Sequence, residues 1–219
     1  MKETAAAWKS AAADTVAELR RVDLLGRATV VLIGSMAREA ATEKSDIDLL
    51  VVSPESLPRF KITPRAQIFR ITRADFLDRM ECGDDFPQWA VRYGKVISDE
   101  SHWWDEVKNN PALQKWPNWR RKRDQVRERL RFATPLRESG DLEHAQEELL
   151  LAARHLARAI LLKECVFPLS QPELPAQLRE IDYSNIAELL DSMVDGDTRE
   201  AALEEAERAI IQIMEELPA

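Results

Sequence analysis

Two short apolar runs, the second opening with a pair of acidic residues, constrain the fold of this chain more than any other feature. Residues 28–35 are rich in β-branched side chains and end in Gly-Ser, and residues 46–53 alternate acidic and apolar side chains before becoming fully apolar. Both compositions are typical of β-strands. The ten residues between them, 36–45, are good helix and turn formers. The pattern predicts two neighbouring strands joined by a short helical connection.

The acidic pair at the start of the second run predicts a metal site. Asp46 and Asp48 are separated only by Ile47. Alternate side chains of a strand share a face, so both carboxylates project the same way while Ile47 points into the core. Carboxylates this close repel each other in an apolar setting, and a bound cation with oxygen ligands relieves the repulsion. We therefore expect Asp46 and Asp48 to bind a divalent ion, most naturally Mg²⁺.

The segment IGSMAREAATEKSDIDLLVV, residues 33–52, resembles the signature of the minimal nucleotidyltransferases of the polymerase-beta superfamily. The resemblance implies transfer of a nucleoside monophosphate from an NTP, with ATP expected, to an acceptor, and release of pyrophosphate. It implies that Asp46 and Asp48 are the catalytic metal ligands, with a two-metal site possible. The nucleotide-binding residues that it implies are Gly34, Ser35, Arg38 and Ser45. Gly34 permits close backbone approach, and Ser35 offers a hydroxyl and a backbone N–H to phosphates.

Two departures from that signature bear on activity. Family members often have glycine after the arginine of this loop, where this chain has Glu39. They also commonly carry a third carboxylate on a following strand, which helps to activate the acceptor. In the expected strand at residues 66–72 we match that position to Arg70. The missing acid is then supplied by Asp75 or Glu81, or the acceptor has its own base, or catalysis is weak or lost.

The order of the remaining elements predicts an α+β chain. We expect an amphipathic helix over residues 4–25, strands at 66–72 and 95–99, a helix at 74–80 and a connector over 103–119. Helical periodicity then covers residues 120–138, 142–164, 184–193 and 198–217. The predicted fold is a polymerase-beta-like domain, a small mixed sheet flanked by helices, over residues 1–110. An all-α helical bundle follows over residues 111–219.

The second half resembles the helical domains fused to such enzymes, of the HEPN and kanamycin-nucleotidyltransferase types. Those bundles help to form the acceptor side of the cleft or a dimer interface, and a homodimer is possible here. HEPN ribonucleases use an Arg and a nearby His, and Arg137 and His144 have a similar spacing. Gly140 lies between them, so we interpret both as ordinary residues at helix ends. His155 lies in an apolar helix and is expected to be structural.

Charge is distributed unevenly along the chain. The formal net charge is -8, so a nucleic acid partner is not expected, although a local patch can still bind one. Nine Lys or Arg against two acids occupy residues 115–137, interleaved with Trp116 and Trp119. That composition suits base stacking and phosphate contact, or a solvated helix with tryptophans at a domain junction. The acidic remainder could attract a cationic acceptor or be an ordinary solvated surface.

Composition limits the environment and the class of protein. Apolar runs such as Val30–Ile33 are far too short to span a bilayer, and Cys82 and Cys165 lack metal-ligand spacing. We expect a cytoplasmic protein with no membrane partner. The leading function is nucleotidyl transfer to a protein hydroxyl or a small molecule. The alternatives are a catalytically weak or inactive nucleotide-binding or partner-binding protein, and a nucleic-acid adaptor acting through the basic segment.

Overall fold

The chain forms two compact units, each with its own core. The computed structural model describes residues 13–14, 16–17, 20–21, 25–41, 45–57, 66–194, 196 and 199–217. The first unit, Met1–Pro117, holds the sheet and is called the sheet unit; the second, Asn118–Ala219, is called the helical unit. Of the helix expected over residues 4–25, the described residues 13–14, 16–17 and 20–21 are helical, and most of the rest lies outside the described residues.

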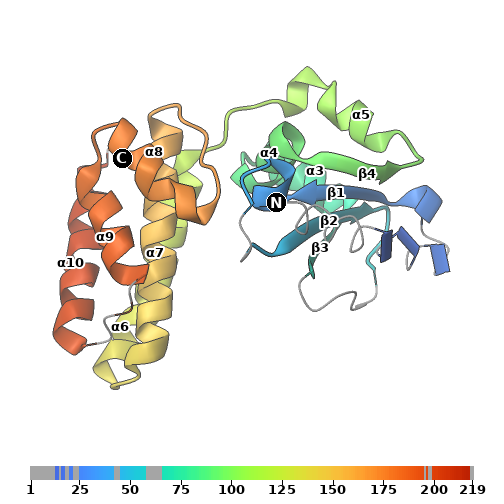
Figure 1. Cartoon of the computed structure of the whole chain (residues 1–219). Coiled ribbons are helices and arrows are strands. Elements are labelled where there is room, and N and C mark those ends of the chain that lie inside the picture. Colours follow the sequence, from blue (N-terminus) through green and yellow to red (C-terminus); the bar gives the residue numbers. More distant parts are fainter. Residues whose placement is uncertain are drawn as a thin grey trace. The chain divides into compact units, whose positions relative to one another are not determined.

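A four-stranded mixed sheet in the order β3-β2-β1-β4 is the framework of the sheet unit (Figure 1). Its strands are β1 (Thr29–Ile33), β2 (Ile47–Ser53), β3 (Ala66–Thr72) and β4 (Lys95–Asp99). β1 is antiparallel to both β2 and β4, whereas β2 and β3 are parallel. The four expected strands are therefore present. With the helices that follow, the predicted α+β class is confirmed.

The central strands β1 and β2 are almost continuously apolar, and their side chains are buried on both faces of the sheet. One face, which carries Leu50 and Val52, packs against Phe76 and Met80. The opposite face carries Val30, Leu49 and Val51. A strand buried on both sides reads as an unbroken apolar run, which is why the two runs stand out in the sequence. The acidic pair lies at the entry of such a strand, where the buried run begins.

Helices follow the sheet on the face of Leu50 and Val52. They are α3 (Arg73–Glu81), α4 (Asp85–Tyr93) and α5 (Trp103–Lys108). The side chains of Thr72 and Asp84 cap α3 and α4 by accepting hydrogen bonds from the backbone N–H of Asp75 and Phe86. The connector predicted over 103–119 is wrong in its first part. α5 forms there because Trp103, Trp104 and Val107 are buried in the core.

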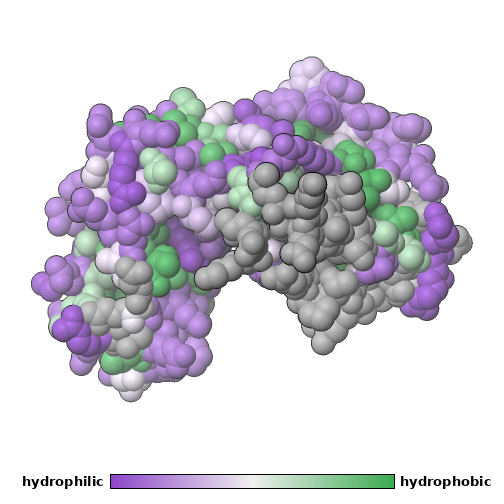
Figure 2. Space-filling model, viewed as in Figure 1, coloured by the Kyte–Doolittle hydropathy of each residue, from purple (hydrophilic) through white to green (hydrophobic). Residues whose placement is uncertain are grey.

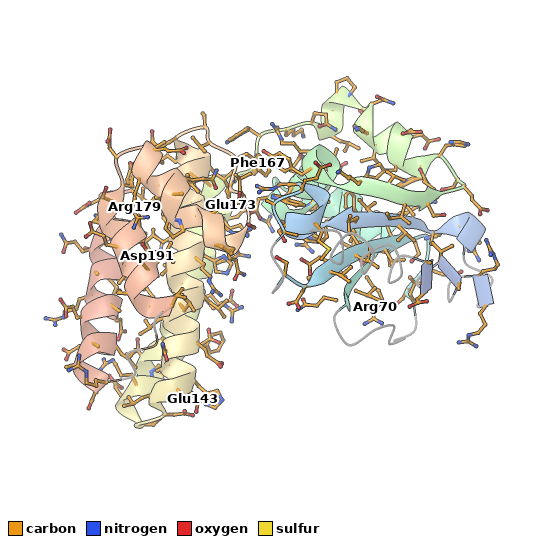
Figure 3. All side chains as sticks on the ribbon, viewed as in Figure 1. Arg70, Glu143, Phe167, Glu173, Arg179 and Asp191 are labelled. Atoms are coloured by element: carbon orange, nitrogen blue, oxygen red, sulfur yellow. The ribbon has the colours of Figure 1, made fainter. Side chains whose placement is uncertain are left out.

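The helical unit is an all-α region with one aliphatic core. Its helices are α6 (Trp119–Glu138), α7 (Leu142–Lys163), α8 (Leu174–Glu180), α9 (Ser184–Val194) and α10 (Glu200–Glu216). The helix α8 was missed because prolines surround it, but Pro175 stands in its first turn, where proline is tolerated. Arg179 and Asp191 form an ion pair between α8 and α9, and both are labelled in Figure 3.

Ion pairs and hydrogen bonds tie α6 to its neighbours. Arg137 of α6 donates to Glu207 of α10 at 3.0 Å, and Thr134 donates to the same carboxylate. Arg129 pairs with Glu148 of α7 at 3.1 Å.

The surface of this unit seen in Figure 2 is largely hydrophilic, with isolated hydrophobic side chains. Within the described residues no helix combines the length and apolarity needed to cross a membrane.

Candidate functional site

The loop between β1 and β2 brings a glycine against the acidic pair. Ile33, the last residue of β1, is paired with Asp48 near the start of β2. Gly34 then turns the chain with φ +74° into the four-residue helix α2 (Gly34–Ala37). A Cβ on Gly34 would lie 2.3 Å from Oδ2 of Asp48, which is closer than a Cβ atom comes to another heavy atom. Glycine is therefore required here both for the backbone angle and for the approach of the carboxylate.

The surroundings of Asp48 disfavour its ionised carboxylate when no cation is bound. Its side chain is partly buried, and burial raises the pKa of Asp48 to about 6, with a smaller contribution from the neighbouring carboxylate of Asp46. Asp46 itself is exposed at the entry of β2. Desolvation and a like charge both disfavour the ionised carboxylate. A bound divalent cation would reverse both effects, so the chemistry of this donor pair suits a metal with oxygen ligands.

The other predicted nucleotide-binding residues surround this turn. Ser35 lies in the first turn of α2, and Ser45 lies in the stretch that leads into β2, next to Asp46. Arg38 caps α2, and its guanidinium lies 5.9 Å from the centre of the Tyr93 ring at the end of α4. Residues 42–44 of the connecting loop lie outside the described residues. The six predicted site residues thus belong to the β1–α2–β2 segment, and Gly34 and Asp48 are brought into direct apposition.

Glu39 preserves the backbone shape that a glycine would give. Its φ is +61°, in the left-handed region that glycine adopts without strain. Its carboxylate pairs with Lys95 of β4 at 2.7 Å, and that hydrogen bond lowers the pKa of Glu39 below its ordinary value. The departure from the family pattern at this position therefore leaves the turn intact. Lys95 is paired with Leu32 of β1, so the ion pair borders the Gly34 turn.

The match of Arg70 to the third carboxylate is wrong. Parallel pairing aligns Gln67 with Asp48 and Arg70 with Val51, so Arg70 belongs to the opposite face of the sheet from Asp48. Arg70 is labelled on β3 in Figure 3. The residues of β3 that share the face of Asp48 are Gln67, Phe69 and Ile71. The sequence could not reveal this, because counting along β3 alone does not tell which residue pairs with Asp48.

Neither Asp75 nor Glu81, the two acids proposed to replace the third carboxylate, contacts Asp46 or Asp48. Asp75 receives a hydrogen bond from Thr72, which is aligned with Ser53 at the far end of β2, roughly 17 Å along the strand from Asp48. Glu81 is exposed at the end of α3. Among the described residues no group of three or more His, Cys, Asp or Glu side chains is placed to hold a metal ion. The described part of the site therefore offers two carboxylates.

Arg137 and His144 each have a local acidic partner in the helical unit. Arg137 and His144 lie on different helices, α6 and α7, with Gly140 at φ +82° in the turn between them. Arg137 pairs with Glu207, and His144 pairs with Asp141 at 2.8 Å, which raises the pKa of His144. The two side chains thus have separate acidic partners. His155 is partly buried in the middle of α7.

Residues 15–101 match the model of the nucleotidyltransferase domain family. This span contains the strands, the Gly34 turn and the Asp46–Asp48 pair, so the sequence resemblance and the family match concern the same segment. The matched span covers most of the sheet unit.

A solved structure extends the comparison at a lower level of similarity. A nucleotidyltransferase-like protein from Exiguobacterium sibiricum 255-15 is 17% identical, and the match covers 94% of this chain and 74% of that chain with a TM-score of 0.49. No curated protein sequence matches this chain. The HEPN-like nature of the helical unit stays a prediction.

Proposed function

We propose that this protein transfers a nucleoside monophosphate from an NTP, with ATP as the expected donor, to a protein hydroxyl or a small molecule. One observation supports it above all others. Because Gly34 has no side chain, the carboxylate of Asp48 can lie against the turn that Gly34 makes. Both residues belong to a segment that matches the nucleotidyltransferase domain family. We assign the transfer to residues 1–110 and contact with the acceptor to residues 111–219.

The residues of the site divide into two roles in this proposal. Asp46 and Asp48 hold Mg²⁺, which would neutralise charge on the phosphates and orient them. Gly34 and Ser35 present backbone N–H groups and a hydroxyl to the triphosphate, and Arg38 adds positive charge at the same turn. The acceptor hydroxyl gives up its proton to a base of the acceptor or to water, and its oxygen forms a bond to the α-phosphorus. The bond from that phosphorus to the bridging oxygen breaks, and pyrophosphate leaves.

A second candidate function is supported by β3. Gln67 and Phe69 occupy the face on which the family places an acceptor-activating acid, and neither can accept a proton from a hydroxyl. A protein that binds nucleotide or a partner without turnover would have this arrangement. We place either form in the cytoplasm, where its two exposed cysteines would stay reduced. We keep a homodimer as a proposal.

The deciding experiment incubates the purified chain with Mg²⁺ and each α-labelled NTP, with and without cell lysate. Asp46→Asn and Asp48→Asn are compared with Asp105→Asn, an exposed carboxylate on α5. The transferase predicts labelled product and released pyrophosphate for the wild type and Asp105→Asn, and none for the site variants. Equal labelling in all four proteins would contradict the site.

Calorimetry with Mg-ATP separates the two candidates when no label is transferred. Binding that needs Mg²⁺ and disappears in Asp48→Asn would support the non-catalytic form. If no NTP binds, the nucleotide site is rejected in both candidates, and only the partner-binding form of the second is left.

A further inference from the structure

The outer face of α4 has an unusual composition. Five of the nine residues of this helix are buried. Of the other four, Arg92 is exposed, whereas Phe86, Trp89 and Tyr93 are partly exposed, and Phe86 and Trp89 also pack against the core. The solvent side of a surface helix is normally polar and charged. Here it is made of three aromatic rings and one arginine, which we call the α4 outer face.

Arginines lie over these rings or their neighbours. Arg79 lies 5.3 Å from the centre of the Phe86 ring, and Arg38 lies 5.9 Å from that of Tyr93. The third contact is made by Arg92 of α4 itself, 5.8 Å from the Trp116 ring, which is 40% exposed. Three cation–π contacts thus involve this one nine-residue helix, and Arg79 also pairs with Asp84 at 2.9 Å. The face therefore combines flat apolar surfaces with positive charge.

The α4 outer face borders the strand ends that carry the carboxylate pair. At its start, Phe86 contacts Phe69 of β3 with ring centres 5.8 Å apart. Phe69 is 41% exposed and belongs to the sheet face of Asp48. The strand spacing and the rise per residue place its Cα about 8 Å from the Cα of Asp48. At its end, Tyr93 lies beside Arg38 of the Gly34 turn. The rings thus run from the outer strand β3 to the turn that precedes β2.

We infer that the α4 outer face binds single-stranded nucleic acid, with bases stacked on its rings and phosphates near its arginines. Aromatic platforms interleaved with cations are how proteins bind single strands without reading sequence. A duplex keeps its bases stacked on each other and cannot use the rings. An acidic peptide without aromatic residues could use the arginines but has no rings to stack on the three aromatic side chains. The binding is separate from nucleotidyl transfer and does not depend on it.

The test is fluorescence anisotropy of a labelled 12-nucleotide uridine RNA with the full chain, in EDTA and low salt. The key variant is Trp89→Leu, which keeps a smaller apolar side chain against the core but removes the stacking ring. The matched control is Phe132→Leu, an aromatic residue 53% exposed on α6 of the helical unit. Trp89→Phe restores a ring. Thermal melts of all variants establish that each is folded.

We expect the wild type, Phe132→Leu and Trp89→Phe to bind the strand alike, and Trp89→Leu to bind about tenfold more weakly. Arg92→Gln is expected to reduce the slope of log affinity against log salt by about 0.7, as for one lost phosphate contact. A single-stranded thymidine DNA should bind as well, and a duplex of the same length more weakly.

Three outcomes would overturn the inference. They are wild-type binding weaker than about 100 µM at low salt, unchanged binding by folded Trp89→Leu, and equal binding of a labelled poly-glutamate peptide or the duplex. Calorimetry with Mg-ATP on Trp89→Leu keeps this test separate from the proposed function, since nucleotide binding should be unchanged there. Loss of strand binding with intact nucleotide binding supports the inference, whatever the outcome of the transfer assay.

Discussion

Replacing Asp48 by Asn should stabilise the metal-free protein at neutral pH. The folded-state pKa of about 6, against an ordinary value of 3.8, means that ionising Asp48 opposes folding. The difference is equivalent to about 3 kcal/mol at 1.36 kcal/mol per pH unit. Part of the carboxylate reaches water, so solvent screening reduces this to about 1–2 kcal/mol. Asn keeps the shape and removes the charge, so Tm should rise by roughly 2–8 °C at pH 7.5.

The pH dependence gives the sign of the effect. An acid with a raised folded pKa contributes stability that is fully present below its unfolded pKa and is lost as pH rises through the folded value. The advantage of Asp48→Asn should therefore grow between pH 4 and pH 6 and stay constant above. Because burial is the larger cause, Asp46→Asn should give only a small part of the gain.

Thermal melts in EDTA at several pH values, and again with Mg²⁺, test this reasoning. Mg²⁺ should raise Tm of the wild type above pH 6 and leave Asp48→Asn unchanged, since the cation relieves a charge that Asn lacks. Asp105→Asn is the control and should show neither effect. The reasoning is refuted if Asp48→Asn melts at or below the wild-type temperature in EDTA at pH 7.5, or if its advantage does not vary with pH.

Three further substitutions test other parts of the chain. Gly34→Ala should abolish Mg-ATP binding measured by calorimetry, whereas Gly140→Ala, with similar φ but open space around it, should lose about 1–2 kcal/mol of stability and keep binding; equal binding by both would contradict the close approach. Glu207→Ala should cost about 2–3 kcal/mol in urea unfolding, because Arg137 and Thr134 lose their partner, against less than about 0.5 for exposed Glu205→Ala. Glu39→Gly should raise Tm slightly, on the order of 1–3 °C, because glycine adopts positive φ without strain; a clear fall would show that the Lys95 contact dominates.

Much of the candidate site could be predicted because its pattern is local. The period of two places Asp46 and Asp48 on one face, and the apolar runs on either side of the Gly-Ser turn mark two buried strands. The long helices α6, α7 and α10 were predictable for the same reason, since their apolar residues recur at helical spacing. The short helices α5 and α8 were not, because few residues form each one and burial of their apolar side chains decides them.

How separate segments meet could not be predicted, because it depends on contacts between residues far apart in the sequence. The register of β3 against β2 depends on which pairing buries the most apolar surface, and a shift of one residue exchanges the two faces. That register places Phe69, and not Arg70, on the face of Asp48. The depth of Asp48, and with it the raised pKa, depends on the packing of neighbouring strands and helices. The sequence by itself determined that two carboxylates share a strand beside a glycine turn. Their environment was decided by long-range contacts, because desolvation and stacking depend on distances that spacing along the chain does not contain.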